Sequence, residues 1–153
     1  MRKLEKNELG ILVDLFRETF KVHNVFQLSY NKVLSYLQKT RGDFIVAEEN
    51  GEIIAALAIV TEVKTRQHKR VRFKHIAVKE EFQGKGVGSD LIKKAEQIVG
   101  KGKIEIHVAE GEKEPIEFYK KNGYEIEGVL KDHYRMGEMC TIMGKVLKWK
   151  LKY

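Results

Sequence analysis

The chain has 153 residues, of which 42% are hydrophobic and 33% are charged, a composition typical of a globular protein that buries its own core. No run of about 18 apolar residues predicts a membrane span, and residues 1–8 lack the apolar stretch of a secretory signal. The single cysteine, Cys140, excludes an internal disulfide, so we expect a cytoplasmic protein. We expect one domain over residues 1–153.

The net charge of +7 favours acidic partners, such as a phosphorylated cofactor or nucleic acid. Acidic residues are interspersed with the basic ones, and no block of like charge is long enough to form a tail. A solvated, lysine-rich and glutamate-rich surface is therefore the simpler interpretation, and we do not expect nucleic acid as the main partner.

Hydrophobic periodicity and turn residues predict the elements in chain order. Asn7 is the expected N-cap of a first helix, Asn50-Gly51 is a hairpin signal, and Pro115 suits the first residue of a short helix. The expected strands cover residues 1–5, 44–49, 52–63, 71–78, 103–108, 124–130 and 138–146. The expected helices cover residues 8–20, 30–40, 86–99 and 115–122. Mostly antiparallel strands around one strand–helix–strand crossover predict a single α+β (mixed α/β) fold.

The most informative segment is a glycine-rich loop between a predicted strand and a predicted helix. Gly84, Gly86 and Gly88 allow close approach of the backbone to a ligand, and the helix start offers unpaired N–H groups to an anion. The segment lacks the Lys-Ser/Thr ending of a P-loop. It also departs from the dinucleotide fingerprint Gly-x-Gly-x-x-Gly, because Ser89 stands where the third glycine belongs.

A third pattern fits the loop. Gln83-Gly84-Lys85-Gly86-Val87-Gly88 satisfies Gln/Arg-x-x-Gly-x-Gly/Ala after a strand ending Ile76-Ala77-Val78, which resembles the acetyl-coenzyme A signature of the GNAT superfamily of N-acetyltransferases. Residues 115–124, which contain Phe118-Tyr119 and Gly123-Tyr124, look like that family's second landmark. Within that superfamily, the chain most resembles the branch of the ribosomal-protein N-terminal acetyltransferases. The resemblance implies a GNAT-like sheet that splays between its fourth and fifth strands and is flanked by helices.

The resemblance also implies a co-substrate, acetyl-CoA, and its binding groups. Backbone N–H groups of the loop would bind the pyrophosphate, and successive amides at a helix start suit a dianion. The loop residues are Gln83, Gly84, Lys85, Gly86, Val87, Gly88 and Ser89. Backbone groups of Ile76, Ala77 and Val78 would pair with pantetheine, and the Val78 N–H would hold the oxyanion of the thioester carbonyl.

Tyr119 matches the family's tyrosine that faces the coenzyme A sulfur, so the resemblance implies that it protonates the departing thiolate. His107 stands twelve residues earlier, where the ribosomal-protein acetyltransferases have a glutamate, and it is the candidate base. Glu105 shares its strand face and would orient or replace it; a water chain is the other option. In the lysine acetyltransferases the base position corresponds to Arg72, which cannot accept a proton. Glu112 stands where the family often has asparagine.

The sequence therefore predicts an acyltransferase that moves an acetyl group to a primary amine by direct attack. The acceptor is a protein or peptide N-terminus, or a small amine. A non-catalytic acyl-CoA-binding regulatory module is one alternative, and a basic nucleic-acid-binding protein is the second. We expect no metal site and no membrane partner, and a monomer or homodimer.

Overall fold

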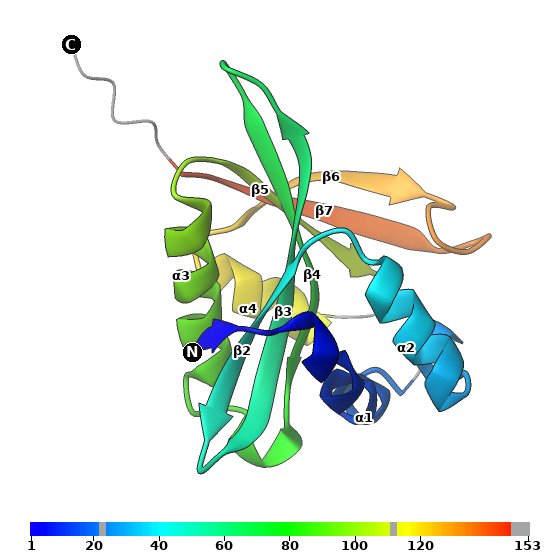
Figure 1. Cartoon of the computed structure of the whole chain (residues 1–153). Coiled ribbons are helices and arrows are strands. Elements are labelled where there is room, and N and C mark those ends of the chain that lie inside the picture. The colour runs from blue at the N-terminus through cyan, green and yellow to red at the C-terminus, as the bar shows by residue number, and fades with distance from the viewer. Residues whose placement is uncertain (22–23, 111–112, 148–153) are drawn as a thin grey trace. The chain divides into compact units, whose positions relative to one another are not determined.

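The computed structural model describes residues 1–21, 24–110 and 113–147, and its helices and strands follow the predicted order (Figure 1). The strands are β1 (Arg2–Lys3), β2 (Asp43–Glu49), β3 (Glu52–Lys64), β4 (Lys69–Val78), β5 (Gly102–Ala109), β6 (Glu125–Lys131) and β7 (Met139–Leu147). The α-helices are α1 (Leu9–Thr19), α2 (Tyr30–Lys39), α3 (Val87–Val99) and α4 (Lys113–Lys121). Short 3-10 helices are η1 (Lys6–Glu8), η2 (Asn24–Gln27) and η3 (Glu80–Phe82).

The strands form a seven-stranded sheet in the order β1-β2-β3-β4-β5-β7-β6. Of the pairs with a recorded register, β4–β5 is parallel and the others are antiparallel. The β4–β5 register covers Arg70–Arg72 against Lys103–Glu105, whereas β5 stays in register with β7 as far as Ala109. The recorded parallel pairs thus occupy only the first part of β4. The mixed, mostly antiparallel fold class is confirmed.

The chain divides into two compact units, Met1–Val60 with Lys74–Ile98 and Thr61–Phe73 with Val99–Tyr153. In the first unit, β2 and β3 carry unbroken runs of buried residues, as strands covered on both faces do. The helices α1 and α2 lie on one side of these strands and α3 lies on the other (Figure 1). On the α1–α2 side, Phe44 and Val46 share a core with Phe16, Phe26 and Leu37. The expectation of one domain over residues 1–153 stays a prediction.

The second unit shows how a strand presents polar groups. In β5, Ile104, Ile106 and Val108 are buried, and the residues between them are only half-buried, which is the alternation that the sequence predicted. Glu105 and His107 therefore point to the same face. Cys140 is buried in β7.

Two predicted helix starts are wrong. The 3-10 helix η1 precedes α1 and is opened by a capping box between Glu5 and Glu8, and the N-cap of α1 is Glu8 rather than Asn7. The helix α4 begins at Lys113, so Pro115 is its third residue rather than its first. Proline is tolerated throughout the first helical turn, because the N–H groups there have no partner within the helix. Glu112 and the tail 148–153 lie outside the described residues. No helix among those described is long and apolar enough to cross a membrane.

The contact between Arg2 and Glu8 makes the stability of the first unit depend on pH. Arg2 donates to Glu8 at 2.7 and 2.8 Å, and this contact lowers the pKa of Glu8 from 4.5 to about 2. Because the folded pKa is depressed, the stabilisation is complete above the unfolded pKa and is lost as pH falls from about 4.5 to about 2. We expect Arg2→Met to be less stable than wild type at pH 6, with most of the difference lost by pH 2.

Urea unfolding at pH 6, 4 and 2 measures this difference. Lys6→Met is the matched control, because Lys6 is exposed, lies two residues from Glu8, and has no ion pair recorded within the described part of the chain. Its effect on the free energy of unfolding should be smaller. An Arg2→Met deficit of equal size at all three pH values would contradict the assignment.

Candidate functional site

The glycine loop directly follows the end of β4 and opens α3. Gly84 and Gly86 have φ of 73° and 84°, in the left-handed region that glycine adopts without strain. Both are exposed, and a Cβ added at either would meet no atom within 4 Å. The helix α3 starts at Val87, so the N–H groups of its first turn have no partner within the helix. The loop therefore presents backbone donors and the positive end of a helix dipole to open space.

Gln83 ties this loop to β4. Its side-chain amide donates to the Val78 carbonyl at 3.0 Å, while the Lys79 N–H donates to Ile54 of β3 at 2.9 Å. These two bonds set where the strand ends and the loop begins. Lys85 holds its ammonium 5.6 Å from the centre of the Phe82 ring. The contact between Gln83 and Val78 was not anticipated, because sequence spacing does not show that a side chain folds back on the preceding strand.

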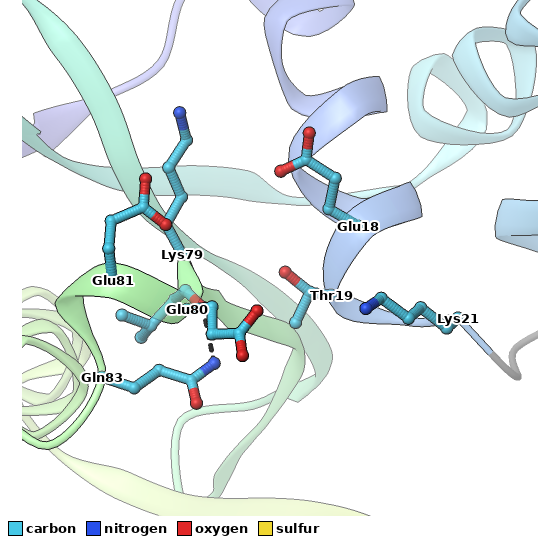
Figure 2. Close-up of a pocket in the computed structure, with 8 residues that line it drawn as sticks. Glu18, Thr19, Lys21, Lys79, Glu80, Glu81 and Gln83 are labelled. Carbon is cyan, nitrogen blue, oxygen red and sulfur yellow. Dashed lines mark hydrogen bonds between the residues drawn. The ribbon is translucent and has the colours of Figure 1, made fainter.

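A pocket of about 390 Å³ lies beside the end of β4, within the first unit (Figure 2). Glu18 and Thr19 from α1 face Glu80 from η3 across it. Lys79 also lines the pocket, and its hydrogen bond with Glu52 raises the pKa of Lys79, so its charge is already paired. The remaining lining residues are Lys21, Val78, Glu81 and Gln83. Three carboxylates and two ammonium groups therefore line the pocket, and one of those ammonium groups is already paired with Glu52, a balance that suits a cation better than an anion.

The strand β4 has an unusual backbone conformation just before Ile76–Val78. His75 has a φ of 54°, which is uncommon for a residue other than glycine and costs roughly 1–3 kcal/mol. Its ring is held by Tyr36, whose hydroxyl is 3.1 Å from Nε2, and packs against Phe26 at a centroid distance of 5.2 Å. His75 is thus half-buried among aromatic side chains and has a hydrogen-bond partner at Nε2. A residue in this conformation interrupts the regular ladder of a strand, which frees backbone groups for another partner.

In the second unit, the candidate base has two polar neighbours. His107 Nδ1 is 3.0 Å from the hydroxyl of Tyr134, and Nε2 is 3.9 Å from a carboxylate oxygen of Glu105. Only 12% of the His107 side chain and 18% of the Glu105 side chain are exposed. Arg72 of β4 donates to the same Tyr134 hydroxyl. The link between these residues was missed by sequence reasoning, because Tyr134 lies in the loop between β6 and β7 and no local pattern predicts where that loop folds.

Tyr119 lies in α4 and is 9% exposed. Its ring meets Phe118 at 5.3 Å and Tyr124 at 6.2 Å, both in edge-to-face geometry. The aromatic packing fixes the ring. Of the predicted site residues, Gln83 and Val78 are brought together in the first unit, and His107 and Glu105 in the second, which also contains Tyr119.

The segment that contains the glycine loop and Tyr119 matches a known protein family. A family model described as an acetyltransferase (GNAT) domain matches residues 40–126, which include the glycine loop and Tyr119. The chain belongs to the GNAT family. This confirms the resemblance drawn from the two sequence motifs.

Relatives of this GNAT chain agree with that result. An uncharacterized N-acetyltransferase of Methanocaldococcus jannaschii is 29% identical over 151 residues, covering 89% of this chain and 65% of the relative. The chain thus spans just under two thirds of that relative's length. A solved aminoglycoside 6′-N-acetyltransferase complexed with coenzyme A has a TM-score of 0.78 at 16% identity, with 97% of each chain covered. The ribosomal-protein-alanine N-acetyltransferase from Brucella melitensis gives 0.71 at 16% identity, covering 95% of this chain and 98% of that one.

Proposed function

We propose that this GNAT protein is an N-acetyltransferase that moves an acetyl group from acetyl-CoA to a primary amine by direct attack. The observation that carries the proposal is the loop from Gln83 to Ser89, which presents backbone donors at the start of α3 within the region that matches the family model. A pyrophosphate is the group that such a loop binds well, since it accepts several N–H donors and neutralises the helix dipole.

The backbone before the loop takes the acyl arm of the cofactor. Ile76, Ala77 and Val78 follow His75, whose φ is positive, and backbone groups of this segment pair with pantetheine amides as an added strand does. The Val78 N–H is the donor for the oxyanion that forms on the thioester carbonyl. Holding both reactants in place supplies much of the acceleration, because the attack becomes effectively unimolecular.

Tyr119 and His107 carry the protons. Tyr119 donates its hydroxyl proton to the departing thiolate, whose pKa of about 8.5 lies below the roughly 10 of a phenol, so the hydroxyl acts as a donor of a strong hydrogen bond or of the proton itself. The acceptor amine reaches the enzyme as an ammonium and must lose a proton before it attacks. His107, oriented by Glu105, receives that proton.

The acceptor is a protein or peptide N-terminus or a small amine. The excess of carboxylates in the pocket beside the end of β4 supports a cationic acceptor. We further propose that the protein works in the cytoplasm, because the single Cys140 of this chain suits a reducing compartment. We also propose that it is a monomer or a homodimer.

A thermal-shift experiment tests the proposal. A ligand at a hundred times its Kd stabilises the native state by about 2.7 kcal/mol, so saturating acetyl-CoA or coenzyme A should raise Tm by roughly 5–10 °C. Pantetheine, which lacks the pyrophosphate, should give a much smaller shift at equal concentration. Absence of any shift with coenzyme A, together with steeply salt-dependent binding to RNA, would favour the nucleic-acid alternative.

A further inference from the structure

Three residues other than glycine have a positive φ within the described part of the chain: Asn50, His75 and Asp132. Asn50 and Asp132 lie in turns, where asparagine and aspartate often take this conformation, whereas His75 lies inside the strand β4. Residues of a strand normally have a φ of about −120° to −140°. An outlier of this kind persists only where the surrounding structure holds it in place.

Aromatic side chains of the first unit hold the His75 ring. The hydroxyl of Tyr36, on α2, lies 3.1 Å from Nε2, and the Tyr36 ring is centred 5.6 Å from the imidazole. Phe26 of η2 meets the imidazole edge-on at 5.2 Å, and the rings of Phe16 and Phe20 lie 5.9 and 6.4 Å from it. Rotation of the His75 backbone toward an extended conformation would move the ring away from these partners.

The segment that follows His75 is fixed at its other end as well. The Lys79 N–H donates to the carbonyl of Ile54 on β3 at 2.9 Å. Only residues 76–78 lie between this bond and His75. Because the φ of His75 sets the direction in which the chain continues, a change from 54° to an extended value would turn the backbone N–H groups of these three residues.

We propose that His75 is a positioning residue for acetyl transfer, and that its contact with Tyr36 holds the Val78 N–H in the direction of the oxyanion. Both side chains act through the backbone of β4 rather than by touching the reacting atoms. The inference rests on the proposed acetyltransferase function. An oxyanion donor works only when it is aimed at the developing charge, and loss of one such donor lowers kcat by about 10²–10³-fold.

The first test compares His75→Gly with His75→Ala. Both variants lack the ring and its contacts, but glycine adopts a positive φ without strain and alanine does not. His75→Ala should therefore have a kcat about tenfold below that of His75→Gly, since alanine is disfavoured in this conformation by about that factor. Equal kcat values at a temperature where both variants are folded would indicate a packing role only, and would overturn the proposal.

Asn50→Ala is the matched control for strain. Asn50 has a φ of 51° in the turn between β2 and β3, so alanine there carries a similar conformational cost. This variant should have a lower Tm and the kcat of wild type. A loss of kcat as large as that of His75→Ala would show that strain elsewhere in the first unit slows the enzyme equally, which contradicts a specific role for His75.

The second test removes the hydroxyl of Tyr36 and keeps its ring. Tyr36→Phe should lower kcat about 3–10-fold, the range expected for one hydrogen bond. Tyr30→Phe, which removes a hydroxyl from an exposed tyrosine at the start of the same helix, is the control and should keep the kcat of wild type. In the His75→Gly background, Tyr36→Phe should have no further effect, because its partner is absent. A further loss of equal size there would show that Tyr36 acts through another group, and the proposal would fail.

Coenzyme A binding separates this proposal from the proposed function. The loop of residues 83–89 lies beyond the bond between Lys79 and Ile54, so most of the thermal shift with coenzyme A should persist in His75→Ala and Tyr36→Phe. A wild type with neither turnover nor a coenzyme A shift would remove both proposals. An active wild type whose kcat survives both substitutions would remove the role of His75 and leave the acetyltransferase standing.

Discussion

Tyr119→Phe is expected to lower kcat by about 10²-fold or more while leaving the affinity for acetyl-CoA unchanged, because general acid catalysis contributes about 10²–10⁴-fold. Without the hydroxyl, the thiolate leaves with neither a proton nor a hydrogen bond. The change should leave the fold intact, since phenylalanine keeps the ring that packs edge-on against Phe118 and Tyr124. Steady-state release of free thiol measures kcat, and the thermal shift with coenzyme A measures binding.

Tyr124→Phe is the matched control for that variant. Tyr124 is 1% exposed, belongs to the same aromatic group, and contacts Lys145 over its ring face at 5.4 Å. If loss of a buried hydroxyl were itself the cause, both variants would slow equally. Normal turnover in Tyr119→Phe would remove this residue from the mechanism. A wild type that binds coenzyme A but acetylates no amine would instead favour the non-catalytic acyl-CoA-binding module.

Gly86→Ala is expected to abolish most of the thermal shift caused by coenzyme A. Gly86 has a φ of 84°, so alanine there is strained by roughly 1 kcal/mol, but its Cβ would meet no protein atom within 4 Å. The methyl group would stand where a pyrophosphate approaches the backbone. The loss of stability without ligand should be small. A loss of coenzyme A binding therefore reflects contact between the new methyl group and the ligand. Calorimetric titration with coenzyme A would give the change in Kd, which we expect to be at least about tenfold.

Gly100→Ala separates strain from ligand contact. Gly100 follows the other end of α3, has a φ of 74°, and is equally open, so its substitution carries a similar conformational cost. Both variants should lose similar Tm without ligand, whereas only Gly86→Ala should lose the coenzyme A response. Equal responses in the two variants would mean that the loop does not bind the pyrophosphate.

Much of the fold is readable from local sequence. The alternation of Ile104, Ile106 and Val108 places Glu105 and His107 on one face of a strand, because side chains in a strand alternate between faces. The Asn50-Gly51 hairpin is equally local, since both residues adopt positive φ in a two-residue turn. The start of the first helix is not local in this way, because the residues before it form a 3-10 turn in which Glu8 contacts Arg2, six positions away.

The sequence by itself determined the glycine loop and its place between β4 and α3. The reason is that the order of the elements follows the chain, and the backbone freedom of glycine depends on the residue alone. Only the tertiary structure decided that His75 adopts a positive φ in β4 while bound to Tyr36, and that Arg72 and His107 both contact the hydroxyl of Tyr134. Those contacts join residues 39, 62 and 27 positions apart. Their formation depends on how loops and helices pack around the strands, and no periodicity along the chain encodes that packing.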